Sequence, residues 1–247
     1  MAVLRVLQDD ALDGPCNMAR DEALLERVGR GQSPPTLRLY QWIEPTISLG
    51  YFQHFADYER LEPPLAGLPV VRRPTGGGAI LHDLELTYCL VVDANHELLS
   101  HGPNRLYEQM HRAMIEALAM LGADAAWSNV TDDSTPSRGP FFCFARRHRY
   151  DLLTDNHKIA GSAQRRTRRG LLQHGSIILA SRFAQHSPIR LNVPFDQAVQ
   201  RMRRDLALNA ADTMGVNLEP GDWTADEVAE ARLLIPKYAG WEWTRRM

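Results

Sequence analysis

The sequence predicts an α+β fold in which mixed or antiparallel sheets are flanked by helices. Strand-like segments outnumber helical ones, and the two kinds do not alternate in the regular order that builds a parallel α/β sheet. The 247 residues are 44% hydrophobic and 23% charged, an ordinary globular composition that can bury a sizeable core. No repeat, low-complexity run or linker divides the chain, so we expect one domain over residues 1–247.

The first half of the chain begins with a predicted helix and continues in strands. Residues 17–28, NMARDEALLERV, predict a helix that Asn17 caps and that stops at Gly29 or Gly31. Two acidic residues lie near its positive N-terminal end, which favours the same assignment. Strand-like segments follow at residues 35–43, 46–53, 68–75 and 85–93.

The second half contains the clearest helix, over residues 103–123, where apolar residues recur at helical spacing between Pro103 and Gly122. Residues 128–140 are polar and rich in turn-forming residues, and predict a mobile loop. The remainder predicts four strands, at 141–144, 150–154, 157–164 and 171–179, with a hairpin turn in the segment TDNHK, and helices near 196–208 and 224–234.

Charge and cysteine content exclude several classes of protein. A formal net charge of −2 gives no whole-molecule reason to expect binding to nucleic acid or a membrane surface. No apolar run is long enough for a transmembrane helix, and the N-terminal segment turns acidic without the apolar region of a signal peptide, so we expect a cytoplasmic protein. Cys16, Cys89 and Cys143 are too few and too scattered for a disulfide framework or a zinc site, and no metal site is expected.

The segment RRPTGGGAILHD, residues 72–83, contains three consecutive glycines. A P-loop would need a Gly-Lys-Ser/Thr sequence that is absent, and a dinucleotide fingerprint starting at Gly76 would need a third glycine where Leu81 stands. A turn without a ligand is one interpretation, since glycines commonly serve tight turns. The other is a site where a ligand lies directly on the backbone and N–H groups hold a carbonyl or carboxyl oxygen.

A second group of candidate residues follows the predicted loop. Cys143 is either an inert buried thiol or a nucleophile, and the basic run at residues 146–149 favours the second because nearby positive charge favours the thiolate. Lys158 is either a solvated charge on a strand edge or a compact cation directed at a carbonyl oxygen or oxyanion. Lys158 can also lie near Cys143 if the predicted strands pair.

Three segments together, RRPTGGGAILHD, KIAGSAQRR and LLQHGSIIL, resemble the signature blocks of the superfamily of lipoate-protein ligases, octanoyltransferases and biotin ligases. The resemblance extends from about residue 17 to about residue 180. It implies a mixed α+β catalytic domain in which the glycine loop lines a tunnel for a lipoyl or octanoyl group and Lys158 points at the acyl carbonyl. The substrate-binding residues that it implies are Arg73, Thr75, Gly76, Gly77, Gly78, Ala79, His82, Gly161, Ser162, Ala163, His174 and Gly175. Of the two histidines, His82 is the stronger ligand candidate because it closes the glycine loop, although either could be a structural histidine.

Two chemistries compete within this superfamily. Ligases activate a free acid with ATP and magnesium, whereas octanoyltransferases take a thioester from acyl carrier protein and pass the acyl group through a cysteine. One branch of the transferases carries a Cys-Phe pair with a Lys-x-x-Gly-Ser-Ala-Gln block fifteen residues later, and CF…KIAGSAQ at Cys143 and Lys158 has this spacing. The following ARRHR departs from the Glu-Ala-Pro-Ser-like stretch usual in that branch.

The resemblance therefore implies that Cys143 and Lys158 are catalytic and that no cofactor is needed. The implied donor is octanoyl-acyl carrier protein, and the acceptor is a lysine of a lipoyl domain such as the glycine cleavage H protein or a 2-oxoacid dehydrogenase E2 subunit. Four alternatives remain: an ATP- and magnesium-dependent lipoate ligase with Lys158 as a ligand of the acyl-adenylate, an amidotransferase between lipoyl domains, a biotin ligase, which the blocks fit less well, and a non-catalytic acyl- or carrier-binding protein.

Basic residues cluster on both sides of Lys158. Arginines stand at 146, 147 and 149, and again at 165, 166, 168 and 169. They are either solvated turns or one basic face that attracts an acidic carrier protein, in which case the association rate depends strongly on salt.

Overall fold

The computed structural model describes residues 2–128, 140–186 and 189–247. Its main feature is a mixed sheet of eight strands in the order β11-β1-β2-β6-β10-β9-β8-β7. β1 runs parallel to β2 and β11, whereas the pairs from β2 to β7 are antiparallel. The predicted α+β class is confirmed. The strands are β1 (Val3–Gln8), β2 (Thr36–Tyr40), β6 (Glu85–Asp93), β7 (Ala126–Trp127), β8 (Leu152–Thr154), β9 (His157–Arg166), β10 (Gly170–Ile178) and β11 (Asn217–Pro220).

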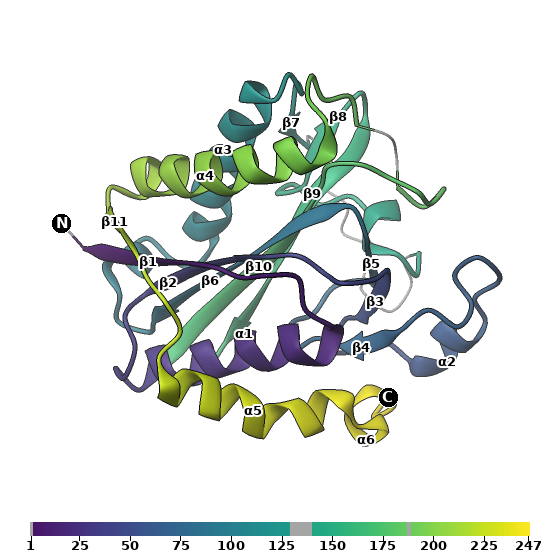
Figure 1. Cartoon of the computed structure of the whole chain (residues 1–247), viewed down its shortest axis with the longest axis horizontal. Helices are drawn as coiled ribbons and strands as arrows, with labels where there is room; N and C mark the ends of the chain where they lie inside the picture. Colours follow the sequence, from purple (N-terminus) through teal and green to yellow (C-terminus); the bar gives the residue numbers. More distant parts are fainter. Residues whose placement is uncertain (1, 129–139, 187–188) are drawn as a thin grey trace.

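Helices cover both faces of this sheet (Figure 1). The long helices α3 (Asn104–Met120) and α4 (Phe195–Met214) pack on one face over a core that includes Leu90, Met114 and Leu206. On the other face lie α1 (Gly14–Gly29) and α5 (Ala225–Ala239), followed by the short α6 (Trp241–Thr244), with Leu24 and Val91 in their core. No helix in the described part of the chain is long and apolar enough to cross a membrane.

A second sheet of three strands lies beside the α1 face. Its order is β4 (Val70–Arg72), β3 (Thr46–Leu49) and β5 (Ile80–His82), and the short helix α2 (Phe55–Glu59) follows β3. Because β4 and β5 both pair with β3, the three glycines form the connection that brings the chain from one side of β3 to the other.

Several predicted boundaries shift in the structure. The first helix begins at Gly14, because Asp13 and not Asn17 accepts the capping hydrogen bond, from the Cys16 N–H. The predicted hairpin turn is confirmed, with Asp155 and Asn156 both at positive φ, as a tight hairpin requires. The mobile loop predicted over residues 128–140 falls, except for its two end residues, outside the described residues.

The prediction of a strand over residues 141–144 is wrong. A single bridge joins Phe142 to Ala79, and Cys143–Ala145 then forms one turn of 3₁₀ helix. The apolar run FFCF suggested a strand, but its rings face different neighbours: Phe141 and Phe142 pack on the small sheet, and Phe144 lies against His186. The turn directs Cys143 into the site described next.

Candidate active site

Cys143 and Lys158 lie in contact, although the strand pairing that was expected to bring them together does not form at Cys143. The Nζ atom of Lys158 lies 3.3 Å from the Sγ atom of Cys143 and 3.2 Å from its carbonyl oxygen. On its other side, the same Nζ atom lies 2.9 Å from a carboxylate oxygen of Asp151. Burial by itself would lower the pKa of Lys158, but its electrostatic and hydrogen-bond interactions with Cys143 and Asp151 outweigh burial and raise the pKa above its usual value. The lysine is therefore a charged group at neutral pH although it is almost fully buried.

The glycine loop holds the backbone of Cys143. The Cys143 N–H donates to the carbonyl oxygen of Ala79 at 2.7 Å, and the Ala79 N–H donates to the carbonyl of Phe141 at 2.9 Å. A Cβ atom at Gly78 would lie 3.0 Å from the Cys143 nitrogen and 3.1 Å from its Cα, closer than side chains normally approach. Gly77 has a φ of +93°, which favours glycine, whereas a Cβ at Gly76 would meet nothing within 4 Å. Gly78 therefore allows the loop to pack directly against the cysteine.

Arg73 and Thr75 brace this loop from within the protein. The Arg73 guanidinium is buried and donates to the carbonyl oxygens of Gly76 and Gly78, at 2.7 Å each. Burial lowers the pKa of Arg73 to about 10, so it stays protonated at neutral pH. Thr75 bonds His174 at 2.6 Å, and the other ring nitrogen of His174 lies 3.1 Å from a carboxylate oxygen of Asp21. These contacts hold the loop whether or not Arg73 and Thr75 touch a ligand.

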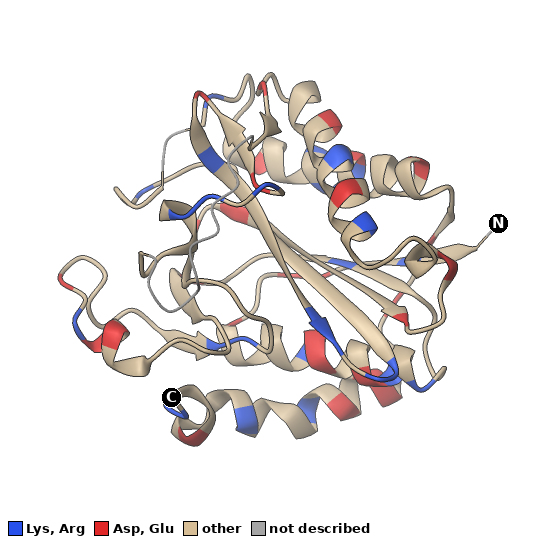
Figure 2. Cartoon of the chain, turned by 180° about the vertical axis from the view of Figure 1, so that it is seen from behind, with Lys and Arg blue, Asp and Glu red and all other residues tan. Residues whose placement is uncertain are grey.

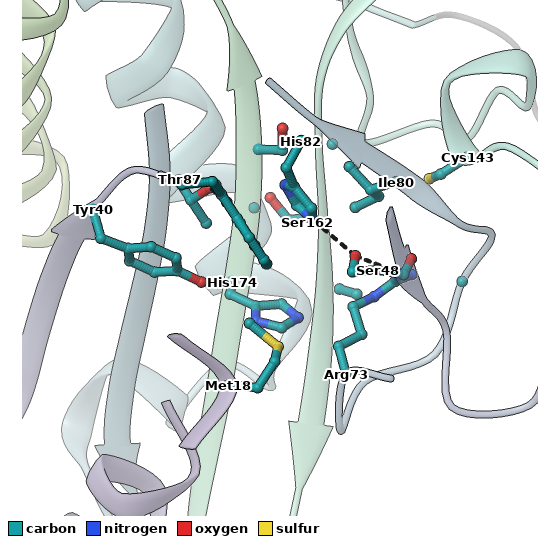
Figure 3. A pocket seen from close by; sticks show the side chains of 16 residues that line it. Met18, Tyr40, Ser48, Arg73, Ile80, His82, Thr87, Cys143, Ser162 and His174 are labelled. Atoms are coloured by element: carbon teal, nitrogen blue, oxygen red, sulfur yellow. Dashed lines mark hydrogen bonds between the residues drawn. The ribbon is translucent and has the colours of Figure 1, made fainter. Parts of the chain in front are cut away.

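A narrow pocket begins at Cys143 and runs along the α1 face of the main sheet (Figure 3). The strand register places four of its wall residues in one row, because Gly161 pairs with Ser176, Ser176 with Thr87, and Thr87 with Tyr40. The row therefore crosses β9, β10, β6 and β2. The pocket holds about 450 Å³ of space that no protein atom fills, a volume that includes its open mouth.

The polar side chains of this pocket are bonded to one another. His82 lies between the Ser48 hydroxyl, 2.8 Å away, and a carboxylate oxygen of Glu85, 2.7 Å away, and its ring stacks on Trp42 at 3.8 Å between centroids. The Trp42 N–H donates to the Thr87 hydroxyl at 2.9 Å. Since these groups already have partners within the protein, they present ring faces and methyl groups to the pocket, which favours an apolar occupant over a polar one.

The remaining predicted residues lie on β9 and β10 beside the pocket mouth. A Cβ at Gly175 would lie 2.4 Å from the Ser162 hydroxyl, and a Cβ at Gly161 would lie 2.8 Å from the Lys158 Cε, so both glycines make room for neighbouring side chains. Ala163 borders the narrow pocket and the wider cleft described next. Beyond Ala160, β9 pairs only with β10 among the described strands, so alternate backbone N–H groups there point away from β10.

A wider and more polar cleft opens on the outer side of Cys143. Basic side chains line it: Arg146, Arg147, Arg149 and Arg166. The other predicted arginines do not line it, because Arg165 lies over the ring of Tyr51, and Arg168 and Arg169 belong to the β9–β10 turn. Figure 2 shows basic residues on the segment after Cys143 and again near that turn. Cys143 thus stands where a narrow, largely apolar pocket meets an open basic cleft.

Sequence reasoning missed two residues of this site. Asp151 forms an ion pair with Lys158. A bulge between β8 and β9 shifts the strand register next to Asp151, and no local sequence pattern predicts such a bulge. His111, on α3, bonds the Ser162 hydroxyl at 2.7 Å, and burial lowers the pKa of His111 to about 3. The sequence contains one feature that could have identified His111. It is a polar residue on the apolar stripe of the helix predicted at 103–123, and a buried polar side chain requires a hydrogen-bond partner.

The fold and this site together define a family. Residues 13–229 match the family of the lipoyl protein ligase A/B catalytic domain, and the chain belongs to it. The chain is 34% identical over 277 residues to Octanoyltransferase LipM from Kyrpidia tusciae, an alignment that covers all of both chains.

Solved structures share the fold at lower identity. A lipoate-protein ligase A bound with ATP is 23% identical, with a TM-score of 0.75 over 99% of this chain and 98% of that one. A bipartite lipoate protein ligase from Thermoplasma acidophilum, studied with its E2 lipoyl domain, is 22% identical, with a TM-score of 0.67 over 99% and 96%.

Proposed function

We propose that this protein is an acyltransferase of lipoate biosynthesis that moves an octanoyl group from acyl carrier protein to a lysine of a lipoyl domain through a thioester on Cys143. The observation that carries the proposal is the position of Cys143, between a narrow pocket suited to an acyl chain and an open cleft suited to a large partner. The similarity along the whole chain to an octanoyltransferase supports the same reaction.

In the first step, the Cys143 thiolate attacks the carbonyl carbon of the acyl thioester. A new C–S bond forms to Cys143, the bond to the donor's sulfur breaks, and that sulfur leaves as a thiolate that takes up a proton. Lys158 and the β9 N–H groups beside Gly161 stabilise the oxyanion that forms in between. Because one thioester replaces another, this step is nearly isoenergetic and requires no ATP.

In the second step, the neutral amine of an acceptor lysine attacks the acyl-enzyme. A C–N bond forms and the C–S bond breaks, so the Cys143 sulfur leaves as a thiolate, while the amine gives up its proton to water. An amide is much more stable than a thioester, so this step is downhill. Lys158 stabilises the charge on the carbonyl oxygen a second time.

Both partners approach through the basic cleft. The cleft is wide and open at Cys143, so that first the donor thioester and then the acceptor lysine can reach the sulfur through it. We propose octanoyl-acyl carrier protein as donor and the glycine cleavage H protein or a 2-oxoacid dehydrogenase E2 subunit as acceptor, and no cofactor. The four arginines of the cleft provide a positive surface for an acidic partner.

Intact-protein mass spectrometry after mixing with octanoyl-acyl carrier protein, without ATP, tests the proposal. We expect a mass gain of one octanoyl group that hydroxylamine removes, that Cys143→Ala abolishes and that Cys16→Ala retains. Cys16 is a suitable control because burial raises the pKa of its thiol to about 11 and keeps it protonated. The chain has only two lysines, Lys158 and Lys237, so acylation of an amine is easily recognised.

Other outcomes identify other functions. Acceptor modification only with free acid, ATP and magnesium, and with Cys143→Ala fully active, would establish a ligase. An acyl-enzyme formed from an octanoylated lipoyl domain but not from the carrier protein would establish an amidotransferase. Binding of octanoyl-acyl carrier protein without transfer of its acyl group would identify a non-catalytic carrier-binding protein.

A further inference from the structure

The narrow pocket has a defined far end. The row of paired residues from Gly161 to Tyr40 spans three strand spacings, or roughly 14 Å, which is the length scale of a medium-length acyl chain. Cys143 lies at the Gly161 end, since its sulfur contacts Lys158 and a Cβ at Gly161 would touch the same lysine side chain. In Figure 3, Tyr40 lies on the side of the pocket opposite Cys143, and Met18, from the same buried cluster, lies below His174, between Tyr40 and Arg73.

Two of the residues at this end are held rigidly. The Tyr40 hydroxyl donates to a carboxylate oxygen of Asp21 at 3.0 Å, and the ring lies under the guanidinium of Arg38, whose carbon is 3.8 Å from the ring centroid. Trp42 is fixed by its hydrogen bond to Thr87 and by its stacking on His82. Neither ring can move without breaking buried polar contacts, so they form the fixed part of the end wall.

Among the described residues that line this end of the pocket, Met18 is the flexible side chain. It lies near the start of α1, is 1% exposed, and belongs to the same buried cluster as Tyr40 and Trp42. A methionine has three rotatable bonds and no hydrogen bond to keep, so its position depends only on packing. A change in the size of residue 18 therefore changes the depth of the pocket without disturbing the hydrogen-bonded walls.

We infer that Met18 sets the length of the acyl chain that this protein accepts, by closing the far end of the pocket against Tyr40 and Trp42. The inference rests on the proposed function for the identity of the occupant, but the depth of the pocket does not depend on the reaction. A smaller residue 18 opens space for about two further methylenes. Their burial is worth about a tenfold preference for the longer chain.

The test compares Met18→Ala and Met18→Phe with Met114→Ala. Met114 is a fully buried methionine of α3 on the opposite face of the sheet, so its truncation creates a similar cavity away from the pocket. Each substitution is made once together with Cys143→Ala and once with Cys143 intact. The Cys143→Ala form is titrated with hexanoate, octanoate and decanoate by calorimetry, and the form with Cys143 intact is acylated by the matching acyl carrier proteins and followed by mass spectrometry. Thermal unfolding confirms that each variant is folded.

We expect Met18→Ala to raise the decanoyl-to-octanoyl ratio about tenfold or more in both measurements, and Met18→Phe to shift the preference toward hexanoyl. Met114→Ala keeps the ratio of the parent protein. An unchanged ratio in folded Met18→Ala and Met18→Phe overturns the inference, as does an equal shift in Met114→Ala. If the free acids show the shift but no variant, including the parent, forms a thioester, the inference stands and the proposed transfer reaction fails.

Discussion

The ammonium group of Lys158 lies between two acidic partners, 3.3 Å from the sulfur of Cys143 and 2.9 Å from a carboxylate oxygen of Asp151. Asp151 also accepts a hydrogen bond from the backbone N–H of His148, which fixes the carboxylate and with it the direction of the lysine. The lysine is thus positioned by one partner and free to act on the other. A cation held this way needs little reorganisation when negative charge develops on a bound carbonyl oxygen.

Removal of this cation should slow acyl transfer far more than it weakens binding. We expect Lys158→Ala to lower the rate of acyl-enzyme formation by on the order of 10²–10³-fold, the usual loss for one preorganised oxyanion donor. Rapid-quench mass spectrometry measures this rate. Lys237→Ala is the matched control, since Lys237 pairs with Glu22 on α1. Equal rates for the two variants would remove Lys158 from the mechanism.

The three consecutive glycines should differ in importance. A Cβ at Gly78 would collide with the Cys143 backbone, whereas a Cβ at Gly76 would enter open space. We expect Gly78→Ala to reduce the acylation rate by roughly 10²-fold, because a displacement of about 1 Å at the nucleophile costs that much, and Gly76→Ala to act at nearly the parent rate. The reverse order of activities would contradict the view that Gly78 positions Cys143.

His111 should make the folded protein sensitive to acid. Its folded-state pKa is lowered to about 3 by burial, while the unfolded value is near 6.5, so between these pH values the unfolded chain binds one more proton. The free energy of unfolding therefore falls by about 1.4 kcal/mol per pH unit from this residue as the pH drops below 6.5.

In the variant His111→Gln, the free energy of unfolding should lose this dependence on pH, because glutamine can still form a hydrogen bond with the Ser162 hydroxyl but does not titrate. Urea unfolding at pH 7, 6 and 5 gives the comparison, and buried His174, whose pKa burial also lowers, contributes equally to both proteins. Identical slopes for the two proteins would mean that His111 is already charged in the folded state.

The basic cleft should attract its partner electrostatically. We expect Arg147→Glu with Arg149→Glu to lower kcat/KM for octanoyl-acyl carrier protein about tenfold or more at low salt, and to flatten its salt dependence. Arg168→Glu with Arg169→Glu makes the same change in net charge at the β9–β10 turn, outside the cleft, and serves as the control. If both double variants behave alike, net charge and not the cleft determines the association rate.

Local patterns in the sequence predicted much of the fold. The apolar spacing of residues 103–123 predicted α3, and the segment TDNHK predicted the turn that joins β8 to β9. Local patterns failed where a distant contact decides the conformation. The segment 141–144 is rich in aromatic residues and was predicted as a strand, but its pairing with Ala79 is limited to one bridge, after which the chain turns.

The sequence by itself determined the chemical groups of the site: a cysteine and a lysine fifteen residues apart, and three consecutive glycines. Only the tertiary structure decided what surrounds them. The pocket wall is a row across four strands, from residues as far apart as Tyr40 and Ser176, and Asp151 reaches Lys158 beside a β-bulge. Chain geometry and side-chain periodicity are local properties that a sequence displays directly, whereas strand register depends on packing between distant segments, which exists only once the sheet has formed.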